Sequence, residues 1–188
     1  MKKPAFFFAL ALTLFGAGCG KTPAPSINES ARSGFGAPEN VLNMIESAVA
    51  VNDATVRDSV MHGKSMQIRL PASWTGDGPI WRVSESDKVT HIRLAYFSDT
   101  PPETEWEAQQ ATDDHRVLSA VAGEGFYDLI VDHPTLRATI YKRFVLETPD
   151  TGLSFYLIEC RIAYEADQSA VWSACKTALD SAEFKSAE

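Results

Sequence analysis

The chain begins with a strongly apolar stretch before its hydrophobic and polar positions settle into regular patterns. Lys2 and Lys3 precede an apolar run over residues 6–15, which a single threonine interrupts, and small residues then lead to Cys19. This order of charge, apolar run and small residues is typical of a cleaved signal peptide and is too short for a membrane-spanning helix. We therefore expect residues 1–18 to be removed and the chain to be exported.

A stretch of small and turn-forming residues separates this leader from the rest of the chain. Residues 20–38 are rich in Gly, Pro, Ser, Ala and Thr and contain few large apolar residues. Such a composition does not build a packed core, so we expect residues 19–38 to form a flexible tether. The remaining residues, 39–188, are enough for a single globular domain of ordinary size.

The first part of this domain changes from a helical period to a strand period. Apolar residues recur at helical spacing over residues 39–51, which predicts a first helix. From Ala54 to Leu70 the apolar positions alternate with polar ones on both sides of a turn at residues 62–64. Alternation with period two is typical of strands, so this segment is expected to form a β-hairpin.

The rest of the domain is expected to contain further strands, a short helix and a closing helix. In chain order these are strands over residues 80–84 and 89–98, a short helix after Pro101 and Pro102, strands over 137–147 and 153–164, and a helix over 167–182. Turn-forming residues at 149–152 make the last two strands antiparallel neighbours. Within the segment 103–131, residues 117–122 and 126–131 fit either helix or strand, with strand favoured for the second. The order predicts an α+β fold, an antiparallel β-sheet flanked by N- and C-terminal helices.

Three segments of this domain resemble the Mog1/PsbP-like family. They read "MQIRLPASW" from residue 66, "LSFYLIECRIAY" from residue 153, and "ALDSAEF" at the end of the closing helix. The resemblance covers residues 54–184 and implies the same α+β fold. The family includes photosystem subunits, chaperone-like adaptors and binding modules, and rarely enzymes. A fold of this kind does not by itself transfer a function.

The end of the leader resembles a lipobox, the cleavage motif of bacterial lipoproteins. It reads Gly16-Ala17-Gly18-Cys19, with glycine at the place where the family usually has leucine. The resemblance implies that Cys19 carries palmitate and other acyl chains, which together anchor a protein stably. The residue after Cys19 is not Asp, which favours the outer membrane, although Lys21 leaves the inner membrane open. The alternative is ordinary secretion with a free thiol at Cys19.

Composition and charge narrow the kinds of partner. With 45% hydrophobic and 22% charged residues the chain is globular. It has 17 basic and 25 acidic side chains, so its net charge is −8. Removing Lys2 and Lys3 with the leader leaves 15 bases against 25 acids, which makes the mature charge −10. Such a surface repels nucleic acid and suits a basic protein partner, although many acidic proteins are merely soluble.

The two cysteines that remain in the domain are expected to form a disulfide. Cys160 lies on the apolar face of the last predicted strand, and Cys175 lies on the apolar stripe of the closing helix. A helix packed on that face brings the two sulfurs together, and exported domains usually pair their cysteines. Two buried free thiols are the alternative.

Candidate catalytic and metal-binding residues have no supporting pattern. Four histidines lack the spacing of metal ligands and are expected on the surface or in turns, namely His62, His91, His115 and His133. Ser173 and Lys176 have the spacing of a Ser-x-x-Lys pair, but the partner motifs of those hydrolases are missing. The acids next to His115 fit solvated charge. We expect no metal, no cofactor and no catalytic residue.

The outer face of the final hairpin is the candidate partner-binding surface. Alternation along the two strands is expected to bring aromatic and arginine side chains together on this face, a mixture that is enriched at binding hot spots. The candidate residues are Tyr141, Arg143, Phe155, Leu157, Glu159 and Arg161. The alternative is that the first helix covers this face and leaves the arginines at its rim.

Together these features predict a lipid-anchored protein-binding module on the periplasmic side of a bacterial membrane. An immunity protein against a delivered toxin, or an accessory subunit of an envelope complex, has this combination of anchor, acidic charge and missing catalytic motifs. The lipid bilayer, reached through Cys19, and an envelope protein are the expected partners. The alternative function is an envelope hydrolase with an unrecognised active site.

Overall fold

The computed structural model describes residues 38–147 and 153–186, which contain three helices and nine strands. The first part comprises α1 (Pro38–Ser47), β1 (Ala54–Met61), β2 (Lys64–Pro71), β3 (Ile80–Arg82), β4 (His91–Phe97) and α2 (Pro102–Gln110). The second comprises β5 (Arg116–Gly123), β6 (Phe126–His133), β7 (Ala138–Leu146), β8 (Phe155–Ala163), α3 (Gln168–Asp180) and β9 (Glu183–Ser186). Cys19, the predicted tether before Pro38 and the turn at 149–152 lie outside the described residues.

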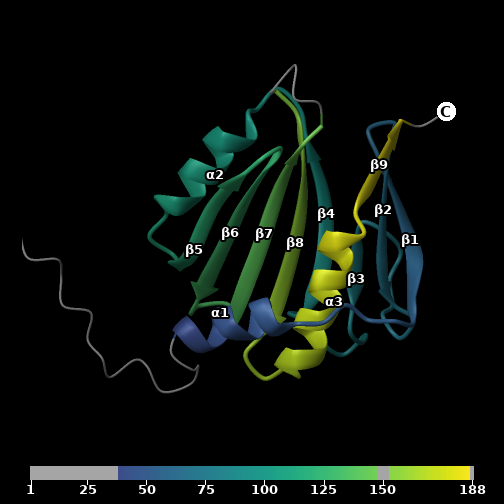
Figure 1. The fold of residues 1–188 in the computed structure, drawn as a ribbon, viewed down its shortest axis with the longest axis vertical. Helices are drawn as coiled ribbons and strands as arrows, with labels where there is room; N and C mark the ends of the chain where they lie inside the picture. The colour runs from purple at the N-terminus through teal and green to yellow at the C-terminus, as the bar shows by residue number, and fades with distance from the viewer. Residues whose placement is uncertain (1–37, 148–152, 187–188) are drawn as a thin grey trace, which may run out of the picture. The chain divides into compact units, whose positions relative to one another are not determined.

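The strands form two antiparallel sheets, so the fold is α+β as the sequence predicts. The main sheet has six strands in the order β3-β4-β8-β7-β6-β5 (Figure 1). The predicted N-terminal hairpin is present, but it belongs to a second sheet with the order β1-β2-β9. Helices α1 and α3 lie on the inner face of the main sheet, and α2 lies on its outer face (Figure 1).

The first hairpin follows directly from its turn residues. Met61 pairs with Lys64, so the loop contains two residues, and both His62 and Gly63 have positive φ. Two-residue loops of this kind match the right-handed twist of the strands they join. The alternation of Met66, Ile68 and Leu70 then places three fully buried side chains on the inner side of β2.

Both terminal helices are shorter than the sequence predicts. Helix α1 ends at Ser47, four residues early, and Val49 is 74% exposed. Helix α3 ends at Asp180, where the Ser181 hydroxyl donates to the carbonyl of Thr177 (2.6 Å) and accepts the backbone N–H of Arg69 (2.8 Å). The chain then turns into β9, so the closing helix ends two residues before its predicted end at residue 182.

The middle segment contains a helix and two strands. Helix α2 follows Pro101 and Pro102 as expected, and its first turn carries Glu103 and Glu105, which suit the positive end of a helix. Residues 117–122 and 126–131, which fitted either state, are strands in β5 and β6. The sequence prediction of a strand is thus confirmed for the second of these segments.

The inner face of the main sheet holds the larger core and the disulfide. Trp81, Tyr156, Ile158 and other buried side chains of the main sheet pack with apolar residues of α3, α1 and β2. Cys160 and Cys175 form a disulfide there, with their Cα atoms 5.9 Å apart. The predicted pairing is therefore confirmed, because α3 packs on the face of β8 that carries Cys160.

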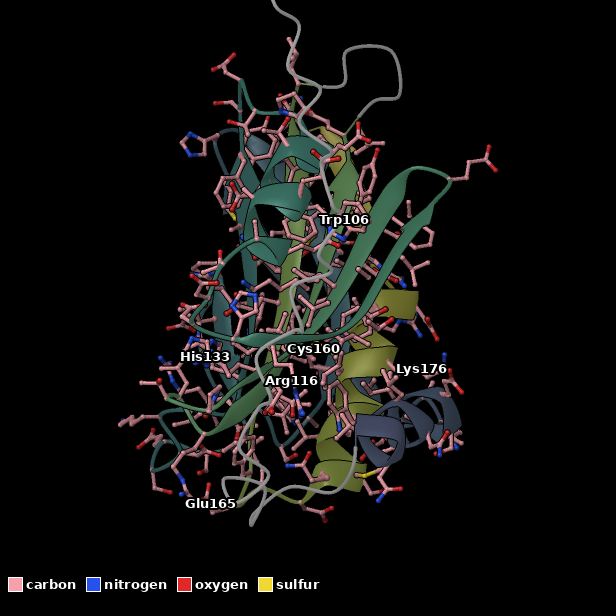
Figure 2. All side chains as sticks on the ribbon, turned by 90° about the vertical axis from the view of Figure 1, so that its left-hand side faces the viewer. Trp106, Arg116, His133, Cys160, Glu165 and Lys176 are labelled. Atoms are coloured by element: carbon pink, nitrogen blue, oxygen red, sulfur yellow. A yellow bond between two sulfur atoms is a disulfide. The ribbon has the colours of Figure 1, made fainter. Side chains whose placement is uncertain are left out.

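A smaller core lies on the outer face under α2. It consists of Leu129, Val131, Ile140, Phe144, Phe155 and Leu157, with Trp106 packed against them. Trp106, labelled in Figure 2, lies with its ring centroid 5.3 Å from that of Tyr127. Its indole N–H donates to the backbone carbonyl of Asp128 (2.9 Å), which ties α2 to the sheet.

Candidate binding site on the outer face of the main sheet

The register of β7 and β8 divides the predicted partner-binding residues between two faces. Tyr141 pairs with Cys160, and Arg143 pairs with Ile158, so both side chains lie on the inner face. The prediction that they lie beside Phe155 and its neighbours is therefore wrong. Because side chains alternate with period two, a register shift of one residue moves every side chain to the other face.

Tyr141 and Arg143 have a structural role on the inner face. The Arg143 guanidinium donates two hydrogen bonds of 2.8 Å to the two carboxylate oxygens of Asp128, and the Tyr141 hydroxyl donates to the same group at 2.8 Å. These contacts raise the pKa of Arg143, and burial together with Asp128 raises the pKa of Tyr141. Arg143 also lies over the ring of Phe126, 4.7 Å from its centroid.

The four candidates on β8 do lie together on the outer face. Phe155 and Leu157 are buried in the core under α2, so they are not available to a partner. The alternative prediction was that the first helix covers this face, but the helix that covers these two residues is α2. Glu159 and Arg161 lie further along the same strand, beyond this core.

Glu159 and Arg161 belong to a cluster of charged residues that we call the arginine cluster. It is built by three cross-strand pairs, since Arg82 pairs with His91, His91 with Arg161, and Arg93 with Glu159. On the other side Lys142 pairs with Glu159. The arginine cluster thus consists of Arg82, His91, Arg93, Lys142, Glu159 and Arg161.

One buried carboxylate organises these cations. Arg93 donates to one oxygen of Glu159 (3.1 Å), Arg161 donates to the other (3.2 Å), and the imidazole of His91 lies 3.7 Å away. Glu159 is 2% exposed. Burial opposes its ionisation, but the imidazole and the three neighbouring cations outweigh burial and hold the pKa of Glu159 at about 2. Glu159 is therefore a buried anion at neutral pH.

The cluster keeps an excess of positive charge and of hydrogen-bond donors. Its four cationic side chains and one carboxylate leave a net charge of +3 with His91 neutral. Lys142 is held by Gln109 of α2 (2.6 Å), and burial lowers the pKa of Lys142. The Nε atoms of all three arginines and Nδ1 of His91 are buried without a hydrogen-bond partner among the described residues. Guanidinium groups positioned in this way suit a carboxylate or phosphate, which they bind through paired hydrogen bonds.

The prediction of surface or turn histidines holds for His62 and for His115, which lies in the bend between α2 and β5, but not for His91 and His133, which lie on strands. His62 is exposed in the first hairpin turn. His91 is only 8% exposed, because it lies on β4 over Glu159. His115 and His133 lie close together beside Asp114, and the side chain of His115 is largely buried. His115 contacts Asp114 (2.5 Å) and the carbonyl of Gln109 (2.8 Å), which fixes the end of α2 to β5.

Other chemical possibilities find no geometric support in the described part of the chain. Lys176 forms an ion pair with Asp180 one turn along α3 (3.1 Å), so its amine is not directed at Ser173. No group of three or more His, Cys, Asp or Glu residues among residues 38–147 and 153–186 is arranged to hold a metal ion. Within those ranges no helix has the length and apolar character needed to cross a membrane.

Comparison with known proteins gives a likeness of fold and no family. No family model and no curated protein matches the chain. Among solved structures the chain is similar to the Ran-binding protein Mog1p of Saccharomyces cerevisiae, at 10% sequence identity and a TM-score of 0.47. The match covers 72% of this chain and 97% of that one. The predicted lipobox lies outside the described residues.

Proposed function

We propose that this chain is an exported, lipid-anchored binding protein of the bacterial envelope, and that the arginine cluster receives an acidic group of a protein partner. The observation that carries the proposal is the convergence of Arg93 and Arg161 on the buried carboxylate of Glu159, with Lys142 opposite Glu159 on the neighbouring strand. Such a carboxylate keeps the guanidinium groups in fixed positions, so a ligand does not have to order them.

The arginine cluster changes the expected chemistry of the partner. Without its leader the chain has 15 bases and 25 acids, and this net charge of −10 attracts basic proteins at long range. At contact distance, however, the cluster selects a carboxylate on the partner surface. The side chains of Arg93 and Arg161 are 39% and 26% exposed, so their outer nitrogens reach solvent. Arginine in a partly desolvated site is a frequent hot-spot residue in protein interfaces.

The test replaces the two arginines that flank Glu159. The full chain carrying Cys19→Ser is used to capture partners from an envelope extract, with and without Arg93→Gln and Arg161→Gln. We expect any specific partner to bind the double variant at least about tenfold more weakly. Lys176→Gln, a cation exposed on α3, is the matched control and is expected to bind as the parent does. Circular dichroism shows whether the double variant keeps the fold.

Two outcomes of this experiment contradict the proposal. A partner that binds the double variant as tightly as the parent shows that another surface makes the contact. Turnover of an envelope substrate, lost on a single polar-to-alanine change, indicates the hydrolase alternative. An immunity role predicts in addition that expression of this chain protects cells from a toxin encoded beside it, whereas an accessory subunit co-purifies with its complex.

The membrane anchor is tested separately. Because the signal peptide, the small residues and Cys19 follow one another in lipoprotein order, we propose that acylated Cys19 holds the chain in the outer membrane. The wild type is expected to incorporate acyl label and to sediment with outer membranes. The Cys19→Ser variant is expected to be released. A variant that stays as membrane-bound as the wild type, together with an unlabelled wild type, contradicts the anchor.

A further inference from the structure

The arginine cluster contains one histidine, the kind of side chain that ordinarily changes charge near neutral pH. His91 is 8% exposed, and its Nε2 atom lies 3.7 Å from a carboxylate oxygen of Glu159. Because a carboxylate accepts hydrogen bonds, the proton of the neutral ring belongs on Nε2. The Nδ1 atom is buried without a hydrogen-bond partner among the described residues. Nδ1 is therefore the position at which His91 can take up a second proton.

Charged groups face His91 from every strand of the cluster and from the loop before β4. Cations oppose a positive charge on the ring, and carboxylates favour it. The cations are Arg82 of β3, Arg93 of β4, Lys142 of β7 and Arg161 of β8. The carboxylates are Glu159 of β8 and Asp87, which precedes β4 and interacts electrostatically with His91. An additional anion in the cluster would therefore favour the protonated ring.

We propose that His91 takes up a proton when the arginine cluster binds an acidic group, so that the affinity of the cluster rises as the pH falls. The inference rests on the proposed function, because it concerns the same site. With His91 neutral, four cations and one carboxylate give the cluster a net charge of +3, and a proton on His91 would make it +4. A bound carboxylate returns this charge to +3. Proton and ligand thus compensate each other, and such coupling is reciprocal.

Glu159 connects the two binding events. Arg161 and His91 share one of its oxygens, at distances of 3.2 and 3.7 Å. When Arg161 also donates to a ligand, this oxygen becomes more available to the protonated ring. Glu159 itself keeps its charge, since its pKa of about 2 lies far below neutral pH. The pH dependence of the site is therefore expected to arise at His91.

Calorimetric titration at two pH values tests the coupling. The full chain carrying Cys19→Ser is titrated with the peptide acetyl-Gly-Glu-Glu-Gly-amide at about pH 7.5 and about pH 5.5, the range in which histidine changes charge. Buffers of different ionisation enthalpy reveal the protons that are taken up. We expect binding to be about fivefold tighter at the lower pH, with uptake of a proton. The peptide loses negative charge as the pH falls, so the gain in affinity cannot come from the probe.

Two histidine variants locate the effect. We expect His91→Gln to bind the peptide with the same affinity at both pH values and without proton uptake. His62→Gln is the matched control, because His62 is exposed in the first hairpin turn, and it is expected to behave as the parent does. Circular dichroism shows whether His91→Gln keeps the fold, and proton uptake by the parent is a readout that does not depend on this variant.

Three outcomes overturn the inference. The parent binds the peptide equally well at both pH values, or it binds at neither, or the pH dependence survives His91→Gln. In the last case another group is responsible, such as His115, which contacts the carbonyl of Gln109. Binding that is independent of pH but weakened by Arg93→Gln and Arg161→Gln overturns the coupling alone. Binding that these two changes leave as tight as in the parent contradicts the proposed function.

Discussion

Replacing Glu159 by Gln measures how much the buried carboxylate stabilises the domain. Glutamine has the shape of protonated glutamate, so the variant resembles the protein with Glu159 neutral. The pKa of Glu159 falls from its usual 4.5 to about 2 in the fold. At 1.36 kcal/mol for each pH unit this corresponds to about 3 kcal/mol. Because Glu159 is 2% exposed, solvent screens little of this interaction.

The effect has a defined pH dependence. A carboxylate whose folded pKa is below its unfolded pKa stabilises the protein fully above the unfolded value, and this stabilisation is lost as the pH falls through the folded value. We therefore expect Glu159→Gln to lower the free energy of unfolding by about 3 kcal/mol at pH 7, and its Tm by about 10 °C. The difference from the parent should begin to shrink near pH 4.5 and nearly vanish near pH 2.

Urea unfolding at pH 7, 4 and 2, with the disulfide kept oxidised, measures these differences. Glu165→Gln is the control, because Glu165 forms an ion pair with Arg137 on the surface and should leave stability unchanged. A Glu159→Gln variant as stable as the parent at pH 7 would refute the reasoning. A loss that stays constant down to pH 2 would also refute it, because the effect would then come from shape and not from charge.

Two further changes test the two cores. Removing the disulfide with Cys160→Ser and Cys175→Ser opens a loop of 15 residues and should lower the free energy of unfolding by about 3 kcal/mol, seen as a lower urea midpoint. The prediction is contradicted if the double variant and the reduced parent both keep the midpoint of the oxidised parent. Trp106→Ala removes the contact of α2 with Tyr127 and the hydrogen bond to Asp128, and should cost about 3 kcal/mol. The loss of hydrogen-exchange protection should then be largest in β6, and a loss spread evenly over the domain contradicts this prediction.

The sequence predicts the elements of this fold well because most of them have a clear period. The first hairpin is defined by alternation on both sides of a two-residue turn with positive φ. The disulfide follows from the face of a strand and the stripe of a helix, both of which are local patterns. Strand β9 was missed because four residues are too few to show a period, and its pairing with β2 is a long-range contact.

Two of the six candidate residues were misplaced because alternation fixes faces within a strand and not between strands. Strand β8 is buried on both faces over most of its length, so its hydrophobic pattern does not distinguish them. The register between β7 and β8 depends on the segment that connects them, and the composition of that segment predicts a turn without fixing its length. A one-residue error in this register places Tyr141 and Arg143 on the same face as Phe155. In the structure both residues lie on the opposite face and form hydrogen bonds with Asp128.

The arginine cluster nevertheless has a signal in the sequence. Charged residues occupy alternate positions in two predicted strands, as His91 and Arg93 in one and Glu159 and Arg161 in the other. Neither pair is informative alone, because alternating charge usually marks a solvated face. The pairing of β4 with β8 brings the two charged pairs together, since it places His91 opposite Arg161 and Arg93 opposite Glu159.

The two faces of the main sheet explain why the cluster lies where it does. On the inner face, α3 and the disulfide hold β8 against a large core, so the strand that carries Glu159 and Arg161 is fixed from behind. On the outer face, α2 packs against β6 and β7. Its residue Gln109 contacts the arginine cluster by accepting a hydrogen bond from Lys142. The charged ends of β4 and β8 therefore stay accessible on a rigid support, which favours binding because little order is lost when a ligand arrives.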